Sequence, residues 1–144
     1  MIGHLFAAPG RYGFPFSELA LALLVGVYAL LAGVLRLGFI GAGRLGKALA
    51  WACDARGLTV TACASRTHSD ATALAQGIDG CEALDAQSVA DRCDLVFITT
   101  QDAAIAPTTA SLRWRPGCRV VHCSGATEIA ALDAAARAGP QVRM

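Results

Sequence analysis

From residue 36 onward, short apolar runs alternate with amphipathic segments, and this pattern is typical of strands followed by helices. The run 94–100 (DLVFITT) is rich in apolar and β-branched residues and predicts a buried strand. The segment 44–56 repeats apolar residues every three or four positions and predicts a helix, which Gly57 ends. The expected strands are 37–40, 58–64, 78–84, 94–100, 119–123 and 141–144, and the expected helices are 44–56, 70–76, 86–92, 106–112 and 127–138.

Strands that alternate with helices predict an α/β fold, a doubly wound and mostly parallel sheet with right-handed crossovers. Several polar residues stand where the helices should begin. Ser69 or Thr67 can cap the helix 70–76, and Pro107 is tolerable in the first turn of the helix 106–112. We expect Asp102 to cap the helix that follows the strand 94–100.

The stretch LGFIGAGRLGKALA contains G-x-G-x-x-G between an expected strand and an expected helix. This is the placement that the dinucleotide-binding fingerprint requires. Gly41 permits a tight turn, Gly43 lets the backbone approach a pyrophosphate, and Gly46 lets the helix pack closely on the sheet. Arg44 either faces the phosphates or is an exposed residue of the first helical turn. The loop residues expected to bind a cofactor are Gly41, Ala42, Gly43, Arg44, Leu45 and Gly46.

The end of the second strand indicates which dinucleotide binds. NAD enzymes usually carry Asp or Glu there, where it binds the ribose 2′-hydroxyl. This chain has Ser65, Arg66 and Thr67 instead, and no acid before Asp70. A guanidinium beside two hydroxyls suits a 2′-phosphate, so we expect NADP rather than NAD. The alternative is that Arg66 is a solvated loop residue.

Further candidates follow the strands 94–100 and 119–123, at the sheet edge where open α/β folds bind ligands. Thr99 and Thr100 end the first of these strands and Gln101 follows it, whereas Ser124 and Gly125 follow the second. Ser124 is a weak candidate for a catalytic residue that donates a hydrogen bond to a nicotinamide or to a substrate carbonyl. His122 lies inside a strand, and a packed core histidine is the favoured interpretation over a general acid.

Composition narrows the classes of function. The chain has 144 residues, enough for one domain with a core, and a net charge of +1, which gives no bulk attraction to nucleic acid or to an anionic membrane. None of its six cysteines forms C-x-x-C or lies near two histidines at metal-ligand spacing. Cys63, Cys118 and Cys123 fall in or beside expected strands, so we interpret them as small buried apolar residues in a reducing, cytoplasmic compartment and expect no metal site.

The segment 19–35 (LALALLVGVYALLAGVL) holds seventeen residues without a charge. Its length is at the short end for a membrane span. Three interpretations stay open: a membrane anchor, an apolar helix packed on the domain or on a partner, and an extension outside the working protein. The expected organisation is thus an N-terminal extension, 1–35, and a dinucleotide-binding domain, 36–144.

Four pieces in this order, LGFIGAGRLGKALA, VTACASRTHSDA, DLVFITTQDAAIAP and RPGCRVVHCSGA, carry a family resemblance. They resemble the Rossmann-like NAD(P)-binding domain of oxidoreductases in the 6-phosphogluconate dehydrogenase-like group. This group includes pyrroline-5-carboxylate reductases and 3-hydroxyisobutyrate dehydrogenases. The resemblance implies that Gly41, Gly43 and Gly46 form the phosphate loop. It also implies that Ser65 and Arg66 contact the adenosine ribose and that Ser124 and Gly125 lie near the nicotinamide.

The chain departs from this family in two ways. Gln101 stands where the family usually has a proline, and the chain stops at Met144, before the helical domain that supplies most of the substrate pocket and the dimer interface in the family. The resemblance therefore implies an NADP-binding domain whose hydride transfer, on an unknown small substrate, and homodimer belong to a longer enzyme. The alternative is a non-catalytic nucleotide-sensing module, tethered to a membrane through 19–35.

Overall fold

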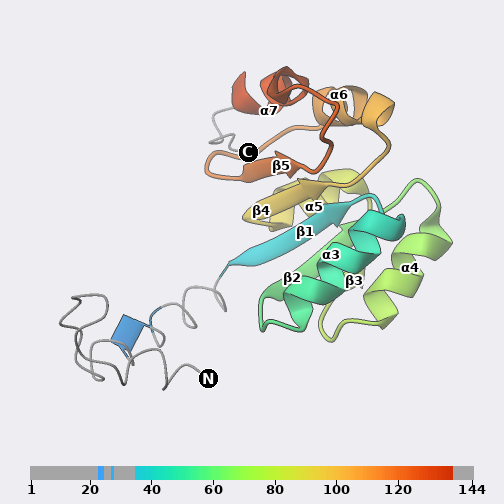
Figure 1. Cartoon of the computed structure of the whole chain (residues 1–144), viewed down its shortest axis with the longest axis vertical. Coiled ribbons are helices and arrows are strands. Elements are labelled where there is room, and N and C mark those ends of the chain that lie inside the picture. The colour runs from blue at the N-terminus through green and yellow to red at the C-terminus, as the bar shows by residue number, and fades with distance from the viewer. Residues whose placement is uncertain (1–22, 25–26, 28–34, 138–144) are drawn as a thin grey trace, which may run out of the picture. The chain divides into compact units, whose positions relative to one another are not determined.

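Within the described part of the chain, five parallel strands form one sheet, in the order β3-β2-β1-β4-β5 (Figure 1). The computed structural model describes residues 23–24, 27 and 35–137. The central strand β1 pairs with β2 on one side and with β4 on the other. The strands are β1 (Arg36–Ile40), β2 (Thr59–Ala64), β3 (Glu82–Ala83), β4 (Leu95–Ile98) and β5 (Arg119–His122).

Helices cover both faces of the sheet, because alternate side chains of each strand point to opposite faces and both sets are apolar. Phe39 of β1 belongs to a core with residues of α3 and α4, whereas Ile40 belongs to a second core with residues of α5, α6 and α7. Figure 1 shows α3 and α4 on one side of the sheet and α5 on the other. The helices are α3 (Arg44–Asp54), α4 (His68–Gln76), α5 (Ala86–Arg92), α6 (Asp102–Ser111), the 3₁₀ helix η1 (Ile129–Leu132) and α7 (Asp133–Arg137).

The expected α/β fold with a parallel sheet is confirmed, but one helix begins earlier than predicted. We expected a helix over 106–112 with Pro107 in its first turn, and α6 instead spans Asp102–Ser111 with Pro107 inside it. Helix-forming Ala103 and Ala104 extend the helix toward its N-terminus. Gln101 is the N-cap, so the expectation that Asp102 caps this helix is wrong by one residue.

The helix predicted over 127–138 is also wrong in its first part. Ser124 Oγ accepts hydrogen bonds from the backbone N–H groups of Ala126, at 3.2 Å, and Thr127, at 3.1 Å. Such a local side-chain turn competes with helix formation. Helical structure therefore begins only at Ile129, first as η1 and then as α7.

Smaller differences affect the other elements. The strand predicted over 78–84 is reduced to β3, and the strand predicted over 94–100 ends at Ile98 in β4. Helix α4 begins at His68 after the N-cap Thr67, so Ser69 lies inside the helix and is not its cap. The predicted strand 141–144 and nearly all of the apolar segment 19–35 lie outside the described residues.

Among the residues that the structure describes, none of the helices combines the length and the hydrophobicity that crossing a bilayer requires.

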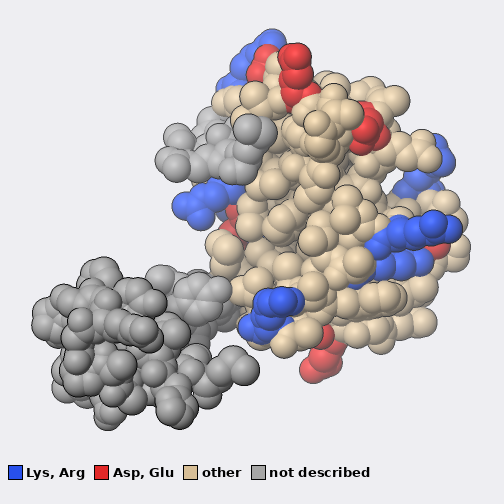
Figure 2. Space-filling view, in the orientation of Figure 1, with Lys and Arg blue, Asp and Glu red and all other residues tan. Residues whose placement is uncertain are grey.

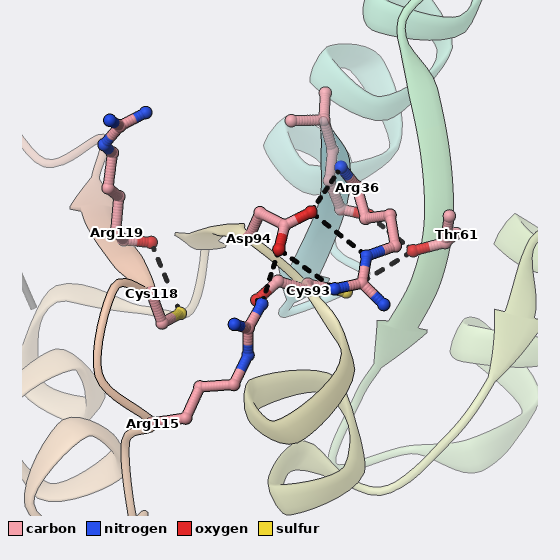
Figure 3. Close-up of polar contacts among 8 residues, drawn as sticks. Arg36, Thr61, Cys93, Asp94, Arg115, Cys118 and Arg119 are labelled. Atoms are coloured by element: carbon pink, nitrogen blue, oxygen red, sulfur yellow. Dashed lines mark hydrogen bonds and ion pairs between the residues drawn. The ribbon is translucent and has the colours of Figure 1, made fainter. Parts of the chain in front are cut away.

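A cluster of charges joins three parts of the chain at the amino ends of the strands (Figure 3). Asp94, just before β4, accepts two hydrogen bonds from the Arg36 side chain at 3.0 Å, and a third from the Arg36 backbone N–H at 3.0 Å. Arg115 donates to the same carboxylate at 2.6 Å and to the Cys93 carbonyl at 2.7 Å. The Arg36 and Arg115 guanidinium groups hold the pKa of Asp94 well below its usual range. The cluster lies at the edge of the sheet opposite the glycine loop and joins the chain segments that lead into β1, β4 and β5.

Candidate nucleotide-binding site

A pocket of about 590 Å³ opens at the carboxyl ends of β1, β2 and β4. In open α/β sheets this edge, next to the point where the strand order reverses, is where ligands bind. The order β3-β2-β1-β4-β5 places that reversal between β1 and β4. The lining residues are Ile40, Gly41, Ala42, Gly43, Ala64, Ser65, Arg66, Thr67, Asp70, Ala86, Thr99, Thr100, Gln101, Ala104, Thr108 and Ser111.

The glycine loop is fixed to the strands on both sides of β1. The Gly41 N–H donates to the Ala64 carbonyl of β2 at 2.8 Å, and the Thr99 hydroxyl donates to the Gly41 carbonyl at 2.7 Å. Gly41 has φ +114°, a conformation that other residues rarely adopt. A Cβ there would also lie 2.6 Å from the backbone of Thr99. The tight turn expected of Gly41 is therefore present.

Gly43 and Gly46 differ in what surrounds them. A Cβ on Gly46 would lie 2.0 Å from the Gly41 carbonyl oxygen, so only glycine lets α3 approach the loop this closely. A Cβ on Gly43 would meet no atom within 4 Å. Gly43 lines the pocket, and the open space in front of it is where a ligand could approach the backbone. Gly46 thus permits the close packing of α3 on the loop, whereas Gly43 faces open space.

Helix α3 begins at this opening. Its N-cap is Gly43, which makes no side-chain capping hydrogen bond, and no acid occupies its first turn. The first N–H groups of a helix lack partners within the helix and carry partial positive charge, so together they attract an anion. Arg44 and Leu45 are exposed and do not line the pocket. Figure 2 shows Lys and Arg side chains on the right of the view, over the beginnings of α3 and α4.

The end of β2 supplies the second part of the pocket wall. Ser65, Arg66 and Thr67 all line the pocket, beyond the buried end of β2. Asp70, in the first turn of α4, lines it as well. Asp70 accepts an ion-pair contact from Lys47 of α3 at 3.4 Å. Arg66 is the only basic residue among the described residues that line the pocket, and Asp70 is the only acidic one.

The end of β4 supplies an unsatisfied polar group. The hydroxyl oxygen of Thr100 is buried and has no hydrogen-bond partner among the described residues, although Thr100 lines the pocket. A buried hydroxyl without a partner costs about 1–3 kcal/mol, so a group that pairs with it is stabilising. Gln101 lines the pocket beside it. The open cradle at Gly43 and this free hydroxyl fit a dinucleotide with several polar groups.

The structure does not bring Ser124 and Gly125 into the lining of this pocket. Ser124 Oγ is engaged by the N–H groups of the turn that follows it. His122 is buried at the end of β5, as the core interpretation expects, and its Nδ1 accepts a 3.3 Å hydrogen bond from the Ser124 N–H. This bond leaves the proton of a neutral imidazole on Nε2, which is buried without a partner in the described part of the chain.

Sequence reasoning missed the part of the pocket wall that comes from helix α6. Ala104, Thr108 and Ser111 repeat at intervals of three or four, so they share one face of the helix. This spacing is visible in the sequence. It was not recognised because the helix was predicted to begin at residue 106, after Ala104. The other lining residues missed are Ile40, Ala64, Asp70 and Ala86.

The cysteines contribute no ligand to the pocket. Cys63, Cys93 and Cys118 are buried, whereas Cys123, which we expected to be buried, is exposed. Burial raises the pKa of the Cys118 thiol to about 11, so it is protonated at neutral pH. Over the ranges 23–24, 27 and 35–137, no group of His, Cys, Asp and Glu side chains gathers closely enough to hold a metal ion.

Several solved structures have a fold similar to that of this chain. The crystal structure of a "putative NADP oxidoreductase" from Bacteroides fragilis is 27% identical, with a TM-score of 0.56 over 63% of this chain and 36% of that one. An imine reductase from Pseudomonas sp. is 20% identical, with a TM-score of 0.62 over 75% of this chain and 39% of that one. The 3-hydroxyisobutyrate dehydrogenase of Mycobacterium tuberculosis is 14% identical, with a TM-score of 0.64 over 75% and 38%.

The chain thus spans less than two-fifths of the length of these three structures. No curated protein matches its sequence. A family model for the Rossmann-like domain matches residues 28–141, which is most of the chain. The chain therefore belongs to the Rossmann-like domain family.

Proposed function

We propose that this chain is the NADP-binding domain of an NAD(P)-dependent oxidoreductase. The observation that carries the proposal is the glycine loop, where Gly43 leaves open space directly before the N-terminus of α3. Its place in a pocket that also includes Arg66 and Thr100 supports a ligand with phosphates at more than one point. The similarity to an NADP oxidoreductase at 27% identity points to the same class of ligand.

Each part of the pocket has a distinct role in the proposal. The Gly43 backbone and the first N–H groups of α3 bind the pyrophosphate. Ser65 and Arg66 bind the 2′-phosphate of the adenosine ribose, because a guanidinium donates paired hydrogen bonds to phosphate oxygens. The Thr100 hydroxyl donates to a polar group of the bound dinucleotide. When bound, the nicotinamide supplies or accepts a hydride.

Hydride transfer is assigned to a longer enzyme that contains this domain. The similar structures are more than twice as long as the segment matched here, and their names describe oxidoreductases. Positioning a substrate against the nicotinamide requires residues in fixed geometry, and these are expected outside this domain. The alternative of a non-catalytic sensing module is less well supported, because the similar structures named above are enzymes.

A thermal-shift titration of the chain with NADPH and with NADH tests the proposal. A ligand that binds only the folded state raises the free energy of unfolding by RT ln(1 + [L]/Kd), about 2.7 kcal/mol at one hundred times Kd. We expect a larger increase in Tm with NADPH than with NADH. A Tm that neither nucleotide changes, in a protein shown to be folded by circular dichroism, would contradict nucleotide binding altogether. Equal shifts would leave nucleotide binding in place and remove the preference for NADP.

A further inference from the structure

An ion pair connects the two helices whose N-termini lie at the pocket. The Lys47 ammonium, in the second turn of α3, lies 3.4 Å from a carboxylate oxygen of Asp70, in the first turn of α4. Lys47 does not line the pocket itself, whereas Asp70 does. The positive charge of Lys47 is therefore paired with a carboxylate that lines the pocket, and this carboxylate offsets it.

Asp70 lies close to the residues assigned to the 2′-phosphate. It is four residues after Arg66 and three after Thr67, and all three line the same pocket. Its side chain is about half exposed, so it is not held by a buried network. A carboxylate in this position repels a phosphate dianion, and it also occupies the positive end of α4 that would otherwise favour one.

We propose that Asp70 is a specificity-determining residue. By neutralising the positive charge of Lys47, it limits the preference of this pocket for a 2′-phosphorylated nucleotide. This inference rests on the proposed function. Arg66 attracts the 2′-phosphate, and the Lys47–Asp70 pair sets how much further positive charge that phosphate meets. The pyrophosphate is common to both nucleotides, so the effect concerns mainly the difference between NADPH and NADH.

The expected size of the effect follows from Coulomb's law. Removing one negative charge that lies within about one Debye length of a phosphate dianion, in water at low salt, changes Kd roughly three- to fivefold. We therefore expect Asp70→Asn to bind NADPH roughly three- to fivefold more tightly and NADH almost unchanged. Lys47→Met leaves the Asp70 charge uncompensated, so NADPH should bind more weakly by a similar factor.

The experiment is isothermal titration calorimetry of the full chain with NADPH and with NADH. It compares the wild type with Asp70→Asn, Lys47→Met and the double variant. The double variant should return most of the way to the wild-type ratio of the two Kd values, because each change cancels the charge of the other. Asp54→Asn is the matched control, since Asp54 ends α3 at a distance from the pocket lining and carries the same charge. Its ratio should equal that of the wild type.

The outcomes separate the two proposals. If the wild type binds NADPH and Asp70→Asn leaves the ratio of Kd values unchanged, or shifts both nucleotides equally, the role of Asp70 is wrong and the proposed function stands. If the folded wild type binds neither nucleotide, the proposed function fails and the inference fails with it. A circular dichroism melt of each variant shows whether a lost affinity reflects lost folding.

Discussion

The Thr99 hydroxyl donates a 2.7 Å hydrogen bond to the Gly41 carbonyl, and so joins the end of β4 to the first glycine of the loop. Thr99 is buried. A Cβ on Gly46 would come within 2.8 Å of this hydroxyl, so the bond lies beneath the beginning of α3. One side chain thus fixes the loop against both the sheet and the helix.

Thr99→Val should lower the stability of the domain. The variant keeps the shape of the side chain but leaves the Gly41 carbonyl without this donor, which costs about 1–3 kcal/mol for a buried group. A loss of 1 kcal/mol corresponds to roughly 4–8 °C in Tm for a domain of about one hundred residues. Thr99→Ser, which keeps the hydroxyl, is the control and should melt closer to the wild type. Equal melting of the Val and Ser variants would show that the hydrogen bond does not matter.

Gly43→Ala and Gly46→Ala form a matched pair that separates binding from folding. Ala at position 43 meets no atom within 4 Å and Gly43 has φ −74°, so the variant should fold with an unchanged Tm. Its methyl group occupies the space proposed for the pyrophosphate, so NADPH affinity should fall at least tenfold by titration. Ala at position 46 meets the Gly41 carbonyl oxygen at 2.0 Å, so that variant should lose several kcal/mol of stability or fail to fold. Full NADPH affinity in Gly43→Ala would rule out this loop as the phosphate site.

Arg66→Ala should reduce the affinity for NADPH and leave that for NADH nearly unchanged. A hydrogen bond to a charged group contributes about 1.5–3 kcal/mol, which corresponds to roughly a tenfold to hundredfold change in Kd. Arg113→Ala provides a control, because Arg113 does not line the pocket. Similar losses of affinity for both nucleotides in Arg66→Ala would contradict the preference for NADP.

Asp94 should make the stability of the domain depend on pH in the acid range. Its pKa is depressed in the folded state by Arg36 and Arg115, so the carboxylate contributes stability that is fully present above the unfolded pKa of about 3.9. That contribution is lost as the pH falls below about 4 toward the folded pKa. Asp94→Asn should therefore melt lower than the wild type at pH 7, and the gap should narrow at pH 3.

Melting curves from pH 7 to pH 3 measure this difference. Asp79→Asn is the control, since Asp79 is an exposed acid for which the structure gives no ion pair. Its Tm should follow the wild type across the whole range. A constant gap between Asp94→Asn and the wild type down to pH 3 would contradict the assigned charge effect.

The order of strands and helices could be predicted from the sequence because each element carries its own pattern. Buried strands such as 95–98 are continuous apolar runs, and glycines mark where strand and helix meet. Helix α6 was harder, because Pro107 favours a helix start near itself and conceals the earlier start at Asp102. The turn made by Ser124 was missed because it depends on which backbone N–H groups its hydroxyl meets.

The site could be predicted in part for the same reason. The loop at Gly41–Gly46 and the end of β2 are local motifs, and the structure brings residues of both into one pocket. The wall from α6 depends on how a crossover helix lies over the sheet, and no short motif encodes that. Ser124 was placed in the site by its position after the strand 119–123 and by the resemblance to the family, and the pocket described here does not include it.

The attachment of the glycine loop to both neighbours of β1 also affects its exchange with solvent. The Gly41 N–H is bonded to Ala64 at 2.8 Å and the Thr99 N–H to Ile40 at 2.8 Å, so neither can open without separating central strands. These amides should exchange with deuterium only when the whole domain unfolds. Adding a nucleotide should then slow their exchange by the same factor by which it lowers the equilibrium constant for global unfolding. The loop proposed to bind the nucleotide would then report on the stability of the entire sheet.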